Sequence, residues 1–374
     1  HIIPGLPGAP PATSSTQVVE TLTAGHRRDA AGRIAAICRA HGLTVVIVHH
    51  AALLTPVLEA RRSAPQIPMR ICIVLHGTDV LSPGAAHEPD IMCDGMREDD
   101  IVVAVSTHLL ESARKTHLWG ACSMEVPNMI DSELFQPGMY NVNFREALES
   151  GCLEMLRAAL PPGGAGGGNG PLVIVGHVSN FRAVKRPLDA VRVVATLRSM
   201  HELNAVLLAV GDGPLRKDAQ QLADALCVPA HFVGALPEVA VSQYVSACDV
   251  VLVTSEVEAF SLTAAEALSC GVPVVATWCG GVQEVLRRAD FSDACLQPFR
   301  LLAPGSIPEL AAHCAALLKG ALTEGGLFDE GASDAGLVAD GDTPHTGSNG
   351  GLRDSYTYKA AQLLGMRLAM RLEH

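Results

Sequence analysis

The sequence predicts an α/β protein with two domains, each built around a parallel sheet. Short apolar runs rich in β-branched residues alternate with alanine-rich runs of helical length along most of the chain. The chain has 374 residues, which is enough for two domains. A segment made almost entirely of Gly and Pro, at residues 161–170, falls where a hinge between two such domains is expected.

The clearest strand and helix lie in the second half of the chain. Val250–Val253 has the length and branching of a strand that is buried on both faces. Leu262–Ser269 is predicted to be a helix, because Gly271 and Pro273 follow as stop signals. A strand at Val272–Ala276 would complete a β-α-β unit. The first turn of such a helix offers unpaired N–H groups beyond the strand's carboxyl end, so we expect an anion site at this junction.

Glu258 and Glu266 flank this junction with the spacing E-x7-E. At 1.5 Å per helical residue, their carboxylates are separated by at most roughly 12 Å and can contact two ends of one extended ligand. The alternative is a structural role, because the segment from Thr263 to Glu266 fits a helix capping box. The spacing alone leaves both interpretations open.

A second strand, predicted at Leu172–Gly176, runs into the basic segment S-N-F-R-A-V-K-R at residues 179–186. Cations directly beyond a parallel strand suit a diphosphate, whose negative charge grows when a sugar bond breaks. Arg182 and Lys185 are the candidate cations. A solvated basic turn before a helix is the alternative.

The order of short motifs from about Pro171 to Leu286 resembles family 4 of the retaining glycosyltransferases. These motifs are G-D-G-P, H-F-V-G, S-A-C-D, E-x7-E, C-G-V-P and G-G-V-Q-E. The resemblance implies the GT-B fold, with two Rossmann-like, doubly wound parallel-sheet domains that face a cleft. It also implies that Glu258 contacts the donor sugar and that Glu266 holds the ribose. The implied donor-binding residues are Asn180, Arg182, Lys185, Gly211, Gly213, Phe232, Gly234, Glu258, Ala259, Phe260, Ser261, Leu262 and Glu266.

Two strings, S-N-F-R-x-V-K-R and L-H-G-T-D at residues 75–79, resemble the family members of the bacillithiol pathway, which join N-acetylglucosamine to L-malate. The implied substrates are UDP-N-acetylglucosamine and a small hydroxy acid, with no metal and no other cofactor. The acceptor-side candidates are His50, His76, Thr78 and Asp79, and the catalytic candidates are Glu258, His76, Arg182 and Lys185. Three alternatives stay open: an impaired UDP-sugar-binding protein, a transferase with another acceptor, and a sugar-nucleotide epimerase.

The first domain departs from the family pattern. We expect it at residues 1–165, truncated or divergent, because the residues before His76 look irregular and contain no glycine-rich loop. The donor domain is expected at residues 171–352, with residues 324–351 disordered. A helix in residues 353–374 is expected to cross back to the first domain. Since there is no initiating Met, we expect the chain to begin inside a longer reading frame.

The bulk composition excludes several classes of protein. A net charge of -12 argues against nucleic acid as a partner. No run of about 18 apolar residues predicts a membrane span. The 11 cysteines include no C-x-x-C pair and suit reduced thiols in the cytoplasm. The D-x-D string Asp340-Gly341-Asp342 lies in low-complexity sequence and is interpreted as chance, and a homo-oligomer is left open.

Overall fold

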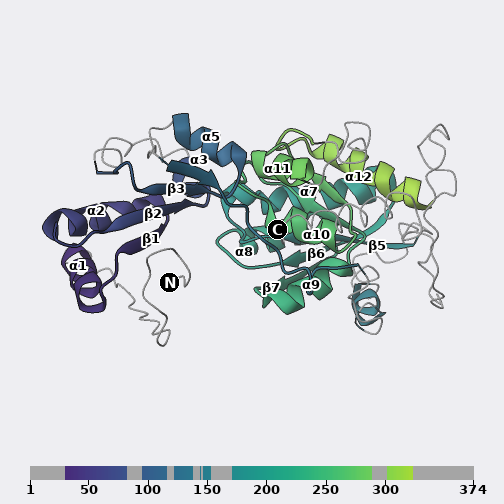
Figure 1. Cartoon of the computed structure of the whole chain (residues 1–374). Coiled ribbons are helices and arrows are strands. Elements are labelled where there is room, and N and C mark those ends of the chain that lie inside the picture. Colours follow the sequence, from purple (N-terminus) through teal and green to yellow (C-terminus); the bar gives the residue numbers. More distant parts are fainter. Residues whose placement is uncertain are drawn as a thin grey trace, which may run out of the picture. The chain divides into compact units, whose positions relative to one another are not determined.

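The structure is a computed structural model that describes residues 30–81, 95–115, 122–137, 144, 146–152, 171–288 and 301–322. The chain divides into two compact units, His1–Pro127 and Asn128–His374 (Figure 1). The described residues 128–152 therefore group with the second unit. The hinge expected from the sequence, at residues 161–170, and the C-terminal segment 353–374 lie outside the described residues, so the predicted domain bounds stay predictions.

The N-terminal unit contains one parallel sheet with the strand order β1-β2-β3-β4. Its elements are α1 (Ala30–His41), β1 (Val45–His49), η2 (Ala51–Leu53), α2 (Leu54–Ser63), β2 (Arg70–Leu75), α3 (Thr78–Leu81), β3 (Ile101–Ala104), α5 (Thr107–Lys115) and β4 (Cys122–Glu125). For residues 30–75, the prediction that the chain before His76 is irregular is therefore wrong. The run V-V-I-V of β1 is short, and its pairing with β2, which the sequence does not reveal, makes it a strand.

The C-terminal unit contains a parallel sheet of five strands with the order β7-β6-β5-β8-β9. Its elements are β5 (Leu172–Val178), η4 (Ala183–Lys185), α7 (Pro187–His201), β6 (Asn204–Val210), α8 (Arg216–Ala225), β7 (Ala230–Gly234), α9 (Glu238–Ser246), β8 (Val250–Val253), α10 (Leu262–Ser269), β9 (Val274–Ala276), α11 (Gly280–Arg288) and α12 (Ile307–Leu322). The predicted bounds of β8 and α10 are confirmed. Strand β9 begins two residues later than predicted, because the amide of Val272 still closes the end of α10 on the carbonyl of Ala267 (2.8 Å).

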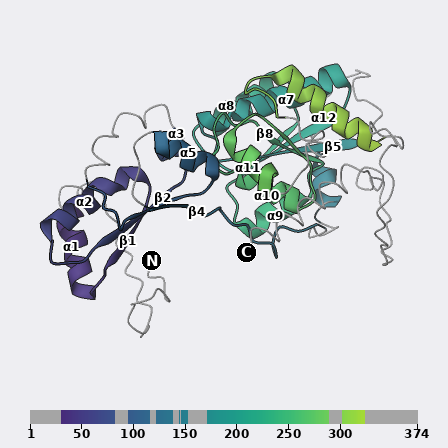
Figure 2. The same cartoon turned by 45° about the horizontal axis from the view of Figure 1, so that its top comes forward.

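The sheet of the C-terminal unit is covered on both faces, as its uninterrupted apolar strands predict. Helices α7, α8 and α12 contribute to one buried apolar cluster with the strands. Helices α9 and α11 both contact α10, which packs on β8 and β9. Figure 2 shows these two groups of helices on opposite sides of the strands. The arrangement is the doubly wound α/β architecture.

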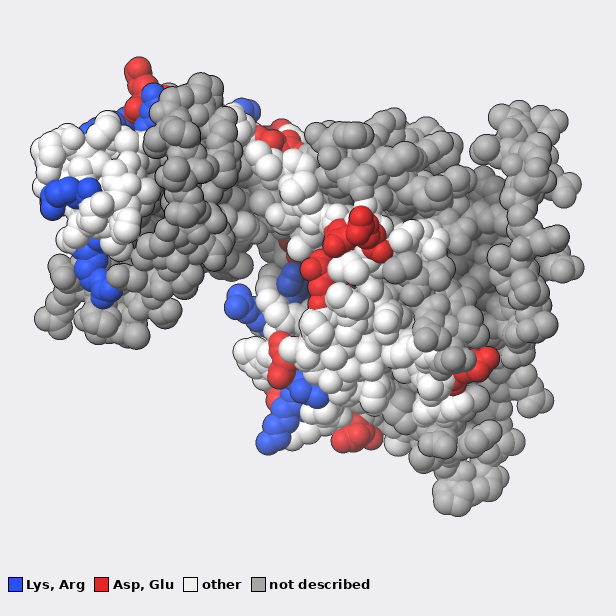
Figure 3. Space-filling view, turned by 60° about the horizontal axis from the view of Figure 1, so that its bottom comes forward, with Lys and Arg blue, Asp and Glu red and all other residues white. Residues whose placement is uncertain are grey.

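The described surface is mixed in charge. On the face that Figure 3 draws, Lys and Arg side chains lie among Asp and Glu side chains. In the described ranges, no helix has both the length and the apolar character that crossing a membrane requires. No disulfide joins any of the nine cysteines in the described part of the chain.

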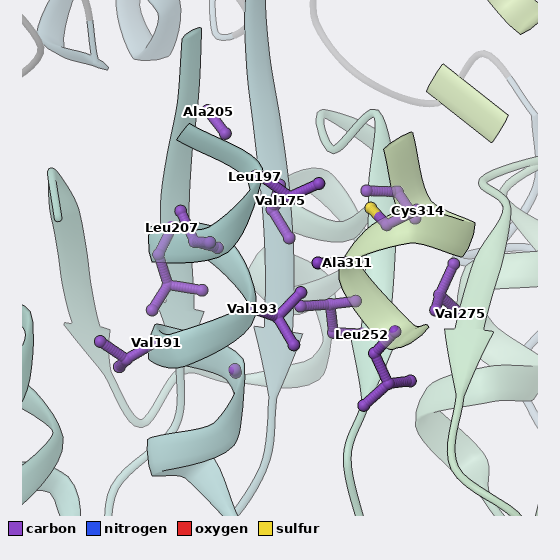
Figure 4. Packing of buried hydrophobic residues seen from close by; sticks show 14 of the residues in the cluster. Val175, Val191, Val193, Leu197, Ala205, Leu207, Leu252, Val275, Ala311 and Cys314 are labelled. Carbon is purple, nitrogen blue, oxygen red and sulfur yellow. The ribbon is translucent and has the colours of Figure 1, made fainter. Parts of the chain in front are cut away.

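The core of the C-terminal unit lies between the strands and the pair of helices α7 and α12. Val193 and Leu197 of α7 and Ala311 of α12 are fully buried against strand residues such as Val175 and Leu252 (Figure 4). Most of these side chains are small or β-branched, which lets helices and strands approach closely with few aromatic residues. The packing fixes β5 and β8 side by side in the middle of the sheet.

Two buried aspartates hold neighbouring strands in register, one in each unit. Asp100 directly precedes β3 and accepts a hydrogen bond from the amide of Ile71 in β2 (2.8 Å). Asp249 directly precedes β8 and accepts one from the amide of Ile174 in β5 (2.7 Å). Asp100 also receives the guanidinium of Arg61, whose Nη1 lies 2.8 Å from both carboxylate oxygens. The S-A-C-D string at residues 246–249 thus ends in a residue that aligns two strands.

Candidate functional site

The candidate site lies beyond the carboxyl ends of β5 and β8. These strands are neighbours in the middle of the sheet, and the chain winds outward from them in opposite directions, through β6 and β7 on one side and β9 on the other. In doubly wound sheets, ligands bind at this topological switch point. Strand β5 leads into the loop 179–186 and β8 leads into the loop 254–261, so residues far apart in sequence meet here.

Lys185 and Glu258 form an ion pair between these two loops. The Lys185 Nζ donates to Glu258 Oε1 at 2.7 Å, and the Ser255 hydroxyl donates to the same oxygen at 2.8 Å. Both charged side chains are largely shielded, with 23% of Lys185 and 11% of Glu258 exposed. Among the described residues, no group donates a hydrogen bond to Glu258 Oε2. The structure therefore brings together the cation and the carboxylate that the sequence singles out, and leaves one carboxylate oxygen for a ligand.

Backbone contacts hold the two loops against each other. The Thr254 hydroxyl lies 2.9 Å from the carbonyl oxygen of Lys185, and the Glu256 amide donates to the carbonyl of Val184 at 2.8 Å. Gly281 at the start of α11 backs the second loop, because a Cβ there would lie 2.7 Å from the Cβ of Glu258. The position of the ion pair thus depends on the backbone as well as on the two charges.

The cations of the basic segment have different surroundings. Asn180 and Arg182 are exposed, and in the described ranges the Arg182 side chain has no acidic partner. Arg186, by contrast, pairs with Asp189 and Glu256 at 2.5 Å each. Arg182 is therefore available to an anionic ligand, whereas Arg186 holds the loop.

The glycines predicted near the nucleotide are required by the backbone. Gly211 has φ +117° and Gly213 has φ +157°. A Cβ on Gly211 would lie 1.8 Å from the carbonyl oxygen of Ser179, and one on Gly213 would lie 1.9 Å from that of Asn180. The loop after β6 thus packs directly on the loop after β5. The Gly211 amide also donates to the carbonyl of Gly234 (2.8 Å), which adds the end of β7 to the same edge.

Helix α10 begins at a different cap from the one predicted. Its N-cap is Ser261, whose hydroxyl accepts from the amide of Ala264 at 3.4 Å. The capping box assigned to Thr263 is therefore wrong, because the Thr263 hydroxyl donates to the carbonyl of Val178 in β5 instead (3.2 Å). This contact ties the start of α10 to the end of β5. It also removes the helix-capping explanation for Glu266.

Two of the three helix-start amides expected to meet a diphosphate already have acceptors. The Leu262 amide donates to the carbonyl of Phe260 at 3.1 Å, and the Ser261 amide donates to the carbonyl of Gly281 at 3.5 Å. The Phe260 amide has no acceptor among the described residues. Ala259 and Phe260 are themselves buried. An anion contact through the backbone here stays a prediction, with the Phe260 amide as its best donor.

Glu266 lies in the second turn of α10 and is half-buried. Within the described ranges its carboxylate accepts no hydrogen bond. Burial and, to a smaller extent, the negative charge of Glu238 in α9 together raise the pKa of this carboxyl to about 7. A partly buried carboxyl group that lacks a donor suits a ligand with hydroxyl groups.

His177, which the sequence did not single out, joins the two central strands. It is buried, its Nδ1 lies 3.3 Å from the carbonyl oxygen of Leu252 in β8, and its Nε2 lies 3.0 Å from the Ser179 hydroxyl. The pKa of His177 is lowered to about 4, mainly because the side chain is buried. The hydrogen bond to the carbonyl of Leu252 opposes this shift, and the charge of Lys185 adds to it. The imidazole is therefore neutral near pH 7 and acts as a structural link.

The acceptor-side candidates lie in the N-terminal unit, at the carboxyl ends of β1 and β2. His76 directly follows β2, and its Nε2 lies 3.1 Å from Nδ1 of His49, with the rings stacked at 5.4 Å between centroids. His50 adopts φ 134°, which is unusual for a residue with a side chain. Thr78 and Asp79 begin α3, and their side chains lie outside the described part of the structure.

Sequence reasoning missed Ser255, Thr277, Gly281, His49 and His177 as site-forming residues. Four of them lie within two residues of the carboxyl end of a strand, and this placement was the available signal. In the described ranges, no group of three His, Cys, Asp or Glu side chains is arranged to hold a metal ion. The D-x-D string at residues 340–342 lies outside those ranges, so the expectation of no metal stays a prediction.

Comparisons with known proteins agree with this geometry. Residues 168–321 match the family of glycosyl transferases group 1. The chain is 30% identical over 271 residues to N-acetyl-alpha-D-glucosaminyl L-malate synthase of Bacillus anthracis, covering 71% of this chain and 64% of that protein. It is 25% identical over 270 residues to D-inositol 3-phosphate glycosyltransferase of Corynebacterium jeikeium, and this match covers 67% of this chain and 60% of that protein. The chain thus spans less than two thirds of each of these relatives.

The fold agrees with that of solved structures. Anabaena Alr3699/HepE in complex with UDP superposes with a TM-score of 0.63 at 17% identity, over 91% of this chain and 78% of that chain. This similarity, the family match and the two parallel-sheet units together establish the GT-B fold, as the sequence predicts. Residues 168–321, which include both Lys185 and Glu258, are thus similar to the glycosyl transferases group 1.

Proposed function

We propose that the protein is a retaining glycosyltransferase that moves N-acetylglucosamine from UDP-N-acetylglucosamine to a small hydroxy acid such as L-malate. The observation that carries this proposal is the contact of Lys185 with Glu258 at the ends of β5 and β8. A nucleotide sugar places a diphosphate next to sugar hydroxyl groups. An ammonium group beside a carboxylate matches both, because the cation suits the phosphate and the carboxylate accepts from the hydroxyls.

The proposed placement of the donor follows from the surrounding groups. The diphosphate would meet Lys185 and the exposed Arg182, and the sugar would meet Glu258. The ribose would donate hydrogen bonds to Glu266, whose carboxylate has no other donor in the described ranges. The loop at Gly211–Gly213 and the end of β7 at Phe232–Gly234 would border the uracil, as the family resemblance suggests.

In the proposed reaction, the acceptor hydroxyl attacks the anomeric carbon on the face from which the phosphate leaves. The bond from that carbon to the phosphate oxygen breaks, the bond to the acceptor oxygen forms, and the departing phosphate takes the hydroxyl proton. The configuration is therefore retained without a nucleophile from the protein. Lys185 and Arg182 would stabilise the negative charge that grows on the diphosphate.

The choice of N-acetylglucosamine and L-malate is supported by the Bacillus anthracis relative, whose name states both groups. The test is mass spectrometry of the full chain incubated with UDP-N-acetylglucosamine and L-malate, followed by a panel of other hydroxy acids. Transfer to a different acceptor would support the transferase activity but would contradict L-malate as the acceptor. An epimerised donor as the main product would favour the epimerase, and UDP binding in calorimetry without any transfer would favour a binding protein.

Glu258→Gln is the matched variant for the assigned site. We expect it to lower the transfer rate by about 100-fold, because it removes a charged acceptor at the reacting sugar. Glu202→Gln is the control, since it makes the same change at an exposed residue of the same unit. Equal rates for Glu258→Gln and the control would contradict the placement of the donor sugar.

A further inference from the structure

Ser255 is a buried polar residue that neither the sequence motifs nor the proposed reaction assigns to a role. It lies two residues beyond the end of β8, and only 3% of it is exposed. Its hydroxyl donates to Glu258 Oε1 at 2.8 Å, and the same oxygen accepts from Lys185 at 2.7 Å. One oxygen of the carboxylate therefore carries two donors from the protein, whereas Oε2 receives none among the described residues.

Thr277 fixes the backbone of Ser255 from the neighbouring strand. Its hydroxyl lies 2.5 Å from the carbonyl oxygen of Ser255 and 3.2 Å from that of Val253, and Thr277 is fully buried after β9. Its amide also donates to the carbonyl of Val253 at 2.9 Å. The serine is thus anchored to the sheet independently of the glutamate that it contacts.

Gly281 limits the movement of Glu258 from the other side. A Cβ on Gly281 would lie 2.7 Å from the Cβ of Glu258, and the Gly281 amide donates to the carbonyl of Glu258 at 2.8 Å. The base of the glutamate side chain is therefore held by packing, and the terminal carboxylate is held through Oε1. The terminal torsion of a glutamate is otherwise broad, so the contacts to Oε1 decide how the carboxylate is oriented.

We propose that Ser255 is a positioning residue that orients Glu258 so that Oε2 accepts a hydroxyl group of the donor sugar. This inference rests on the proposed function, because it names the group of that same site that prepares the sugar contact. Without the serine hydroxyl, the carboxylate can turn and present both oxygens to Lys185. A site held in its binding geometry before the ligand arrives loses less freedom on binding.

The test compares the affinities of the full chain for UDP and for UDP-N-acetylglucosamine in calorimetry. Glu258 is placed on the sugar, so Ser255→Ala is expected to weaken UDP-N-acetylglucosamine about tenfold, the usual effect of one hydrogen bond to a charged group. The affinity for UDP should change less than about twofold. Ser269→Ala is the control, because Ser269 is a buried serine of α10 whose hydroxyl has no partner among the described residues.

A double substitution separates positioning from a structural role. If Ser255 acts through Glu258, then Ser255→Ala should cause no further loss of affinity in a Glu258→Ala background. An equal loss for UDP and for the UDP-sugar, or a full additional loss in that background, would overturn the inference alone. Failure of the unsubstituted chain to bind UDP-N-acetylglucosamine would overturn both the inference and the proposed function.

Discussion

Replacing Glu266 by glutamine should remove a pH-dependent loss of stability from the C-terminal unit. Burial, together with a smaller contribution from the charge of Glu238, raises the pKa of this carboxyl from 4.5 to about 7. At about 1.36 kcal/mol for each pKa unit, the change corresponds to about 3 kcal/mol of folding free energy. Because Glu266 is only half-buried, solvent screening makes this value an upper bound.

The sign follows from proton binding by the two states. Between pH 4.5 and about 7, the unfolded chain releases the Glu266 proton while the folded chain keeps it. The unfolded state then binds fewer protons, so the free energy of unfolding falls as the pH rises. Below this window both states are protonated, and above it both are ionised. The stability contribution is thus complete below pH 4.5 and lost above about pH 7.

The measurement is denaturant unfolding of the full chain from pH 4.5 to 8.5, followed by amide hydrogen exchange in residues 250–269. Hydrogen exchange reports on β8 and α10 separately from the N-terminal unit. The stability of Glu266→Gln relative to the unsubstituted chain should increase up to about pH 7 and then stay constant. Glu202→Gln, at an exposed position, should leave the pH dependence unchanged. A constant difference between Glu266→Gln and the unsubstituted chain over the whole range would refute the argument.

Three other substitutions test the fold. His177, with its pKa lowered to about 4, should make the unit lose up to about 3 kcal/mol as the pH falls from 6.5 to 4, and denaturant unfolding of His177→Gln should lack this loss. Gly211→Ala should cost more than about 3 kcal/mol in thermal unfolding, because its Cβ meets a backbone carbonyl, whereas Gly42→Ala, with open space at φ +61°, should cost about 1 kcal/mol. Arg61→Met should cost about 3 to 5 kcal/mol, since it leaves Asp100 buried and unpaired, and an unchanged denaturation midpoint would contradict this.

The sequence predicts the C-terminal sheet well because its strands are buried on both faces. Val250–Val253 and Leu262–Ser269 have the apolar content and the stop signals that fix their ends, and the structure has the same bounds. The N-terminal unit was less predictable. Val45–His49 forms an edge strand that is partly exposed, so its pattern is weak and its pairing with β2 decides its conformation.

The candidate site likewise contains residues that the sequence identifies and residues that only the folded structure reveals. Glu258 and Lys185 were found because a family motif marks them, but their contact joins residues 73 positions apart and follows from the pairing of β5 with β8. Ser255 and Gly281 are not part of any residue spacing in the sequence that indicates a chemical role. Their roles depend on contacts of the loop after β8 with Thr277 and with the start of α11, which become visible only when the chain is folded.

Under the proposed function, Lys185 is a cation held ready for a diphosphate in a chain whose net charge is -12. Both side chains of the Lys185–Glu258 pair are largely shielded from solvent, and the ion pair is one restraint on the lysine. Here the backbone of the lysine is held as well, since its carbonyl accepts from the Thr254 hydroxyl beyond β8. The loops after β5 and β8 are therefore joined through backbone groups as well as through the ion pair, and these backbone contacts do not depend on which partner the ammonium group takes. Under the proposed function, donor binding needs only a local exchange in which Lys185 turns from Glu258 Oε1 toward a phosphate oxygen.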